Sequence, residues 1–338
     1  MTTATKPKVS IVVPSYNRGE FIEATLKSIQ EQTYEDFEVL FIDDGSTDDT
    51  QEIFDKKFSQ DKRFIYIKQK NSERAVARTH GLEQAKADLL CLVDSDDLWY
   101  PHKLEKQVAV MDADPDLVFC YASVNRIDME GNPVKSASRQ HQGSSGFVFF
   151  DLLMRNFIPS VCPIFRKSAF EKVGAQVTEF IPYEDWDFWL RFSRLGKFHH
   201  IKEPLGDYRL HPGQSVQNVK AVHIERVTLK VLEANVQKLT KTDITNYLNM
   251  QGRTLNQVGF IETEYRDIIA EAYSMAYLRF AYWYLVSDKP DTCKRRLLES
   301  YKFSNKRLLD YRWYGLWAAY YLKPFFKESI TKFLGSFH

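Results

Sequence analysis

Three carboxylates stand together directly after an apolar run, at Asp94, Asp96 and Asp97. The run at residues 89–93 has the composition of a buried parallel strand, so the acids fall at its carboxyl end, where open α/β sheets bind their ligands. Carboxylates this close repel one another unless a cation joins them. Carboxylates that leave coordination positions open suit Mg²⁺ or Mn²⁺ bridging a diphosphate. A solvated acidic turn is the alternative for so short a motif.

The ends of two earlier apolar runs carry side chains suited to a nucleotide. Tyr16 follows the run at residues 9–13, and Asp44 follows the run at residues 37–42. A nucleotide base needs a flat apolar surface, which Tyr16 can supply, and an acceptor for its imide N–H, which Asp44 can supply. Each residue alone is better explained as part of a turn. Because three strand ends with such chemistry share one predicted sheet edge, the sequence favours a nucleotide diphosphate site.

An arginine, an acidic pair and a histidine are further candidates. Arg78 lies on a predicted helix and suits bidentate contact with phosphate or hydrogen bonds with a base carbonyl, although this residue alone favours a surface role. Glu184 and Asp185 begin another helix beside Trp186. Acids at a helix start often serve as caps, but a carboxylate shielded by aromatic rings can have a raised pKa and act as a general base. His211 is either a loop residue or a ligand to a metal or diphosphate.

The elements that must position these residues follow a strand–helix alternation, which predicts a mainly parallel sheet flanked by helices. The predicted strands are 9–13, 37–42, 64–67 and 89–93, and the predicted helices are 20–32, 47–58, 75–87 and 101–111. The rhythm then changes to predicted strands at 117–122 and 160–165, a turn at 128–133, a helix at 184–195 and an extended segment at 198–210. We predict an α/β domain at 1–215 and a helical C-terminal region at 216–338.

Composition bounds the class of protein. The 338 residues are 44% hydrophobic and 27% charged, which is ordinary for a globular chain and argues against disorder. The net charge of +1 gives no sign of a nucleic-acid partner. The four cysteines lack metal-ligand spacing and are predicted to be reduced and mostly buried. We expect a cytoplasmic protein, since no signal peptide or apolar stretch of membrane-spanning length is present.

The C-terminal end differs from the rest in charge and in aromatic content. Residues 289–338 hold eleven Lys and Arg but four Asp and Glu, and residues 301–337 contain twelve aromatics. Aromatic and basic residues on one helix favour the membrane interface, which predicts peripheral contact with the inner face of the membrane. A helical core or a self-association surface is the alternative, because Tyr and Trp are also common in protein interfaces.

The motifs together resemble those of the family 2 glycosyltransferases, inverting enzymes with the GT-A fold, over roughly residues 8–215. The resemblance rests on the order and spacing of Pro14-Ser15-Tyr16-Asn17, Asp43-Asp44-Gly45-Ser46-Thr47-Asp48, Ala77-Arg78-Thr79-x-Gly81, Asp94-Ser95-Asp96-Asp97 and Glu184-Asp185. One departure is Thr79, where the family usually has Asn after the Arg. The resemblance implies a Rossmann-like GT-A domain with a mixed, mainly parallel sheet.

The resemblance also implies roles for single residues. Tyr16 and Asp44 would hold the base with help from Arg78, and Asp94 would lie near the ribose or the sugar. The nucleotide-sugar-binding set then comprises Pro14, Tyr16, Asn17, Asp44, Arg78, Asp94 and Ser95. Asp96 would bind the metal, and Asp97 and His211 are further candidate ligands. Asp185 would be the catalytic base, with Glu184 and Trp186 on the acceptor side.

These roles imply a metal-dependent inverting glycosyltransferase that uses Mg²⁺ or Mn²⁺. A sugar, with a UDP-sugar as the first choice of donor, would pass to a hydroxyl of a glycan or lipid-linked acceptor in surface polysaccharide or lipid-linked glycan synthesis. Asp185 would take the proton from the attacking hydroxyl. A nucleotidyltransferase would also use such a sheet with acidic metal ligands, but a Gly-rich basic loop is expected after its first strand, where this chain has Pro14 and Tyr16. A non-catalytic nucleotide-sugar-binding protein would be expected to have lost the acids.

Overall fold

The structure is a computed structural model, and it describes residues 6–134, 143–214, 219–240, 242–243, 245–246, 269–281 and 289–303. The chain divides into two compact units. The first comprises the described residues of Met1–Lys135 with Gly143–Val148 and Phe157–Gln214. The second comprises Phe149–Asn156 and the described residues after Ser215. All candidate site residues belong to the first unit.

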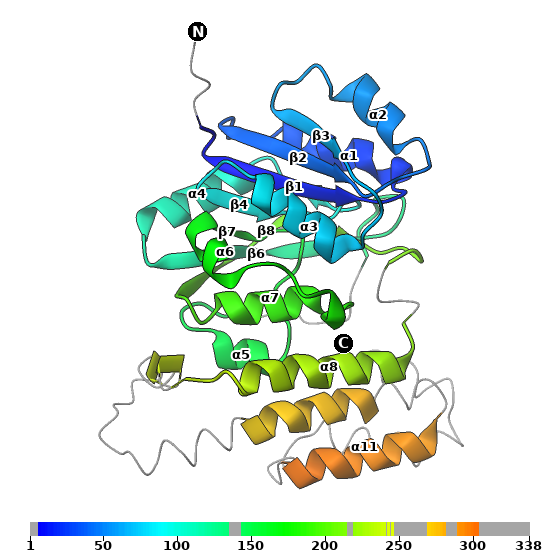
Figure 1. Cartoon of the computed structure of the whole chain (residues 1–338), viewed down its shortest axis with the longest axis vertical. Coiled ribbons are helices and arrows are strands. Elements are labelled where there is room, and N and C mark those ends of the chain that lie inside the picture. Colours follow the sequence, from blue (N-terminus) through cyan, green and yellow to red (C-terminus); the bar gives the residue numbers. More distant parts are fainter. Residues whose placement is uncertain are drawn as a thin grey trace. The chain divides into compact units, whose positions relative to one another are not determined.

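The first unit is built on one eight-stranded sheet in the order β3-β2-β1-β4-β7-β6-β8-β5 (Figure 1). Its strands are β1 (Val9–Ser15), β2 (Phe37–Asp43), β3 (Phe64–Lys68), β4 (Leu89–Leu92), β5 (Leu98–Trp99), β6 (Leu117–Ile127), β7 (Ile164–Arg166) and β8 (Lys197–Arg209). The first four are mutually parallel, whereas β7 runs antiparallel to both β4 and β6. The sheet is therefore mixed and mainly parallel, as the sequence predicts.

Helices cover both faces of the parallel half. The helices of the first unit are α1 (Gly19–Gln30), α2 (Thr50–Lys57), α3 (Arg74–Gln84), α4 (Lys103–Ala113), α6 (Lys167–Val173), η1 (Thr178–Phe180) and α7 (Glu184–Phe192). Alternate β1 residues such as Ile11 face a core layer that α1 and α4 complete. Val12 faces the other way, toward Gly81 of α3. A Cβ at Gly81 would lie 2.4 Å from a methyl carbon of Val12, so only glycine lets α3 approach the sheet this closely.

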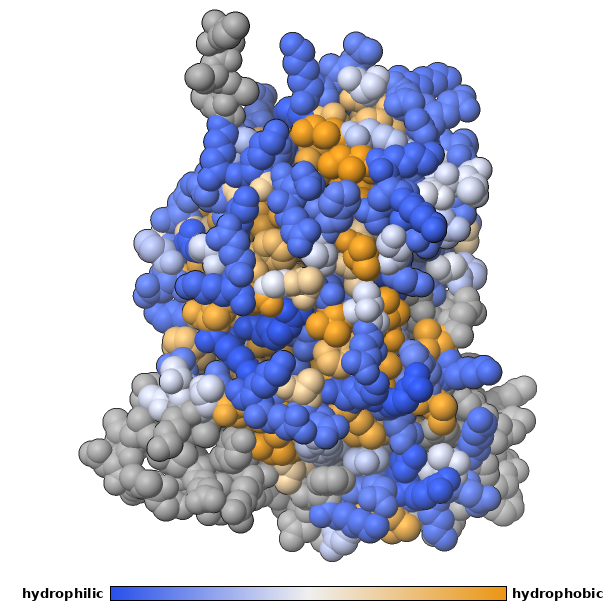
Figure 2. Space-filling view, viewed as in Figure 1, coloured by the Kyte–Doolittle hydropathy of each residue, from blue (hydrophilic) through white to orange (hydrophobic). Residues whose placement is uncertain are grey.

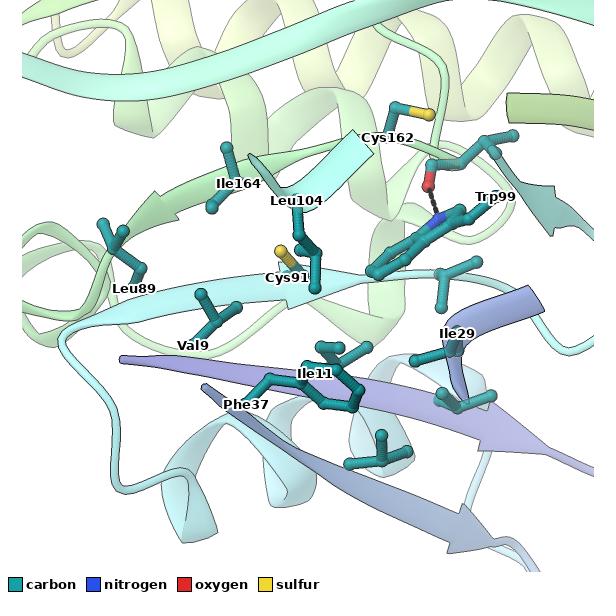
Figure 3. Packing of buried hydrophobic residues seen from close by; sticks show 14 of the residues in the cluster. Val9, Ile11, Ile29, Phe37, Leu89, Cys91, Trp99, Leu104, Cys162 and Ile164 are labelled. Atoms are coloured by element: carbon teal, nitrogen blue, oxygen red, sulfur yellow. Dashed lines mark hydrogen bonds between the residues drawn. The ribbon is translucent and has the colours of Figure 1, made fainter. Parts of the chain in front are cut away.

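The core layer on the α1 and α4 side fixes the strand ends in place. Figure 3 shows Val9, Ile11, Leu89, Cys91 and Ile164 from neighbouring strands in this layer, together with Leu104 of α4. The Trp99 indole N–H donates to the Val161 carbonyl oxygen at 2.7 Å, as the dashed line shows. All four cysteines are free and buried. Burial of this kind makes the sheet a rigid platform, because close-packed cores yield little to local strain.

Three element boundaries differ from the sequence prediction for physical reasons. The second helix begins at Thr50 instead of residue 47, because the Asp48 carboxylate accepts the Thr50 backbone N–H at 3.2 Å and holds a turn there. The strand predicted at 160–165 is limited to β7, since Trp99 and Gln107 take the carbonyls of Val161 and Cys162. The strand predicted at 117–122 is β6, which extends to Ile127 and pairs along its length with β8.

The second unit is helical where it is described. Its helices are α5 (Phe149–Met154), α8 (Ala221–Val236), residues 269–281 and α11 (Pro290–Phe303). The Arg296 guanidinium of α11 pairs with Glu225 of α8 at 2.5 Å. The Ser274 hydroxyl donates to the Ser300 carbonyl oxygen at 2.8 Å. These contacts join the three longer helices, in agreement with the helical C-terminal region predicted from the sequence.

Hydrophilic residues predominate on the face seen in Figure 2, with smaller apolar areas between them. Among the described helices, none is both long and apolar enough to cross a membrane. The aromatic and basic segment at residues 304–338 lies outside the described residues. The choice between membrane contact and self-association of that segment therefore stays a prediction.

Candidate active site

The candidate residues converge because β1 lies between β2 and β4. Ser15 pairs with Asp43, and Val12 pairs with Leu92, so the carboxyl ends of the three parallel strands reach one edge of the sheet. Tyr16, Asp44 and the Asp94–Asp97 turn are the residues that follow these ends. The sheet therefore brings together the three groups that lie about 30 to 50 residues apart in the sequence.

Tyr16 presents an aromatic surface to solvent at the end of β1. Its side chain is 47% exposed, whereas Pro14, two residues earlier, is buried within the strand. Asn17 follows with a φ of 51°, and its side-chain oxygen accepts the Thr47 backbone N–H at 2.8 Å. Asn17 thus ties the loop after β1 to the loop after β2. An exposed ring on a fixed loop is a suitable stacking surface for a base.

Asp44 is held by neutral donors on one of its two carboxylate oxygens. Oδ1 accepts the Gln69 side-chain amide at 2.7 Å and the Ser72 backbone N–H at 2.9 Å. No described residue donates to Oδ2, although the residue is only 3% exposed. A carboxylate has about four acceptor sites, so Asp44 keeps capacity for a further N–H donor.

Asp94 and Glu184 are joined through Arg78 of α3, and Arg74 of the same helix also binds Glu184. The Arg78 guanidinium donates from Nη2 to Asp94 and from Nη1 to Glu184, the latter at 2.9 Å. Arg74 binds the same Glu184 carboxylate in bidentate fashion and also donates to the Pro182 carbonyl oxygen at 3.2 Å. Glu184 is 1% exposed, and the arginines keep its pKa below the ordinary value against the opposing effect of burial. This network fixes the start of α7 against the end of β4.

Asp185 follows Glu184 and is partly buried. Burial and the Glu184 charge raise the pKa of Asp185 to about 6, while Arg78, Arg74 and the Trp186 backbone N–H oppose the rise. The Ser160 hydroxyl donates to Asp185 Oδ2 at 3.3 Å, and the Trp186 backbone N–H donates to Oδ1 at 2.7 Å. A carboxylate with a pKa near 6 is well matched to accept a proton at neutral pH.

Asp96 and His211 form the candidate metal-binding pair. His211 Nε2 lies 2.9 Å from Asp96 Oδ2, which places two ligand atoms of different segments side by side. Arg18 Nε is 3.8 Å from the same oxygen. Among the described residues, no group of three or more His, Cys, Asp or Glu side chains could hold a metal ion. The pair therefore fits a cation that takes its remaining ligands from a diphosphate and water, as Mg²⁺ and Mn²⁺ do.

Asp97 is turned into the protein and not toward Asp96. It is 0% exposed, and its Oδ1 accepts the Arg209 backbone N–H at 3.0 Å. Its Oδ2 is buried without a hydrogen-bond partner among the described residues. Burial, together with the charges of Asp96 and Asp94, raises the pKa of Asp97 well above its ordinary value. Asp97 thus sits as a structural link between the acidic turn and β8.

Sequence reasoning missed several residues of this arrangement. Arg74 lies four positions before Arg78, a spacing that places both on one face of a helix and could have been noticed. Arg209 donates from Nε to the Asp96 carbonyl oxygen at 2.8 Å and so positions the acidic turn. Gln69 and Ser160 have no motif in the sequence that marks them. Arg78 was expected near the base, and the structure places its guanidinium on Asp94 and Glu184.

Part of the chain is similar in sequence to known glycosyltransferases. Residues 10–174 match the family model for glycosyl transferase family 2. An uncharacterized glycosyltransferase of Rickettsia bellii is 32% identical over 209 residues, which cover 60% of this chain and 29% of that protein. The putative teichuronic acid biosynthesis glycosyltransferase TuaG of Bacillus subtilis is 29% identical over 61% of this chain and 80% of its own length. The chain spans less than half the length of the rickettsial relatives that it matches first.

Solved structures share the fold. S. aureus TarS residues 1–349, in complex with UDP-GlcNAc, align with a TM-score of 0.56 at 17% identity over 88% of this chain and 91% of that one. The mannosyltransferase PcManGT from Pyrobaculum calidifontis, in complex with GDP-Man and Mn²⁺, aligns with a TM-score of 0.52 at 14% identity over 96% and 89%. The mixed sheet shares the fold of these structures, and the match over residues 10–174 leads to one conclusion: this chain contains a region at residues 10–174 that matches glycosyl transferase family 2.

Proposed function

We propose that the chain transfers a sugar, with inversion, from a UDP-sugar to a hydroxyl group of a glycan or lipid-linked acceptor. The observation that carries the proposal is the placement of Asp44, Asp94, Asp96 and Asp185 at one edge of the sheet, each in a different electrostatic setting. The relationship to TuaG, whose name assigns it to teichuronic acid biosynthesis, supports a role in surface polysaccharide synthesis.

The nucleotide would bind over the ends of β1 and β2. Tyr16 offers the ring for stacking, and Asp44 offers an oxygen for the imide N–H of uracil. Pro14, Asn17 and Ser95 shape the surrounding loops, since Asn17 holds Thr47 and the Ser95 carbonyl oxygen accepts the Thr25 hydroxyl at 3.0 Å. TarS, which shares the fold, binds UDP-GlcNAc, which supports uracil as the first choice of base.

The metal would be held by Asp96 with His211 as a second ligand. When bound, Mg²⁺ or Mn²⁺ neutralises charge that develops on the leaving diphosphate. The 2.9 Å separation of Asp96 Oδ2 and His211 Nε2 suits a shared ion, and PcManGT carries Mn²⁺ in its complex. Arg209 Nε donates to the Asp96 carbonyl oxygen and so holds the main chain of Asp96 in place. The inward orientation of Asp97 argues for a supporting role instead of direct ligation.

Asp185 would accept the proton of the attacking hydroxyl. It stands at the first turn of α7, beside the Asp94–Arg78–Glu184 network that would face the donor sugar. Trp186 is buried beneath it, which keeps this turn in place on the acceptor side. Because one base suffices for a single displacement, no second catalytic carboxylate is required, in contrast to glycoside hydrolysis.

The test is a donor panel in which water serves as the acceptor. The full chain is incubated with UDP-sugars and GDP-sugars in MnCl₂, and nucleoside diphosphate release is measured. We expect release from at least one UDP-sugar, loss of release in EDTA and strong loss in Asp185→Asn. Release of nucleoside monophosphate instead would indicate a nucleotidyl or phosphodiester reaction. If the chain binds UDP but turns over no sugar nucleotide even when glycan acceptors are added, the result would indicate a binding protein and not an enzyme.

A further inference from the structure

The carboxylate proposed to hold the base is itself held by a hydrogen-bond chain. His80 Nδ1 lies 2.6 Å from Gln69 Oε1, and Gln69 Nε2 donates to Asp44 Oδ1 at 2.7 Å. Asp44 is an acceptor, so the Gln69 amide must turn its nitrogen toward it. Its oxygen then faces His80, which must donate from Nδ1. The orientation of each member is thereby set by the next one.

The chain occupies one of the two Asp44 oxygens. Oδ1 accepts both the Gln69 amide and the Ser72 backbone N–H, the latter at 2.9 Å, whereas no described residue donates to Oδ2. Gln69 Nε2 also carries a second hydrogen, for which the described residues supply no acceptor. Asp44 and Gln69 therefore offer one oxygen acceptor beside one N–H donor.

We infer that Gln69 and His80 determine base specificity, because they leave Asp44 a single acceptor that selects uracil over guanine. This inference rests on the proposed function. The edge of uracil carries one imide N–H between two carbonyl oxygens, which matches an acceptor next to a donor. The edge of guanine carries an N–H and an NH₂ side by side, and these require both carboxylate oxygens for a bidentate contact. Guanine would leave a donor facing the occupied Oδ1.

Local geometry restricts other arrangements of Asp44. Gly45 follows it with a φ of 82°, and a Cβ there would lie 2.9 Å from the Asn71 backbone nitrogen. The Gln69 backbone N–H donates to the Asp43 carbonyl oxygen at 2.9 Å, which extends the β2–β3 pairing by one residue. Gln69 and Asp44 therefore lie side by side on adjacent strand ends, so the amide contact is built into the sheet.

Two variants remove the chain at different links. Gln69→Met keeps the length of the side chain but cannot donate to Asp44, and His80→Leu removes the group that orients the amide. His80→Asn is the matched rescue, since its amide nitrogen can replace Nδ1 as a donor. Lys70→Met changes an exposed neighbour of Gln69 and serves as the surface control. Circular dichroism melting shows which variants fold.

The measurement is the ratio of GDP to UDP dissociation constants by calorimetry in MnCl₂. We expect wild type to prefer UDP by about tenfold or more, which corresponds to one lost hydrogen bond to a charged group. Gln69→Met and His80→Leu should each reduce this preference by about fivefold or more, while His80→Asn and Lys70→Met keep it. If both of the first two fold, bind UDP and keep the wild-type ratio, the inference is wrong.

A further variant separates this inference from the proposed base site. Asp44→Ala should weaken UDP binding if the base lies at Asp44. If Asp44→Ala leaves UDP affinity unchanged, the base does not bind at Asp44. The specificity role of Gln69 and His80 is then also wrong. If Asp44→Ala loses UDP but Gln69→Met retains the full preference, the base site stands and only the role of Gln69 and His80 is overturned.

Discussion

The two ends of the candidate site handle their carboxylates in opposite ways. At the base end, Asp44 is held by an amide and a backbone N–H, both neutral, and no cationic side chain of the described residues pairs with it. At the catalytic end, Asp94 and Glu184 are bound by Arg78, and Glu184 also by Arg74. Both ends lie on the same sheet edge, so the difference comes from the side chains around the acids and not from the fold.

This difference indicates which substitutions should affect binding alone and which should also affect the stability of the fold. Removal of the Gln69 amide leaves the Ser72 backbone N–H on Asp44, so changes at the base end should alter affinity and cost less stability than the loss of an arginine. Removal of one partner from a buried ion pair leaves the other charge uncompensated, so changes at the catalytic end should spread to the fold and to the pKa of Asp185.

The largest effect is expected for Asp96→Ala. The variant should lose transfer activity to below detection while its melting temperature stays near that of wild type, because Asp96 lies at the surface of the site and outside the core. Activity measured in excess MnCl₂ checks this. Activity near the wild-type level in EDTA-treated buffer would contradict the metal role of Asp96.

Asp185→Asn should lower kcat by about 10²–10⁴, the usual contribution of a general base. The substitution preserves shape and can still accept the Ser160 hydroxyl, but it cannot take a proton. Single-turnover rates with saturating UDP-sugar measure the chemical step. If kcat is unchanged, another base must act, and Glu184 is the first alternative.

Arg78→Met should destabilise the fold by about 3–5 kcal/mol, as expected when one partner of a buried ion pair is removed. The Arg78 guanidinium is buried between Asp94 and Glu184. When it is removed, Arg74 still pairs with Glu184, but Asp94 loses the arginine with which it pairs. Urea unfolding measures the loss. Arg63→Met is the matched control, because the more exposed Arg63–Asp61 pair should contribute at most about 1 kcal/mol.

Tyr16→Ala and Asp44→Ala should each weaken UDP binding by about tenfold, in line with one stacking contact or one charged hydrogen bond. Their unfolding free energies should change little in comparison with Arg78→Met. Calorimetry with UDP gives the affinity without a requirement for turnover. Unchanged affinity in both variants would remove the base pocket from this position.

The smallest effect is a shift in pH dependence for Arg74→Met. The pKa of Asp185 is raised to about 6, so Asp185 is protonated below that pH and activity should fall as the pH drops through 6. Arg74 opposes the raised pKa, so its removal should move this acid limb to higher pH. Arg78, Glu184 and the Tyr208 hydroxyl are the other groups near Asp185. Lys62→Met, on the exposed surface, should leave the limb in place.

The strand ends were predictable from the sequence because their signals are local. The apolar runs before Tyr16, Asp44 and Asp94 mark buried strands, and parallel pairing brings such ends to one edge. The proposed base Asp185 could also be predicted, since an acidic pair beside Trp186 at a helix start is visible in the sequence. The mainly parallel sheet with helices on both faces followed from the same alternation, whereas its mixed character was implied by the family resemblance.

The partners of these acids were not predictable, because they depend on tertiary distances. Nothing in the sequence indicates that Arg74 reaches Glu184, 110 positions later, or that His80 reaches Gln69 across the end of β3. Asp97 shows the same limit. Its neighbours suggest a third metal ligand, yet the backbone after β4 turns its side chain inward to the Arg209 N–H.

The most direct test of the account compares UDP affinity in Asp185→Asn and Asp44→Asn by calorimetry in MnCl₂. Both changes remove one charge and preserve shape, one at each end of the site. The account predicts that Asp185→Asn binds UDP within about twofold of wild type, while Asp44→Asn binds at least about tenfold more weakly. Equal loss of affinity in the two variants, or loss in Asp185→Asn alone, would contradict the separation of donor binding from chemistry.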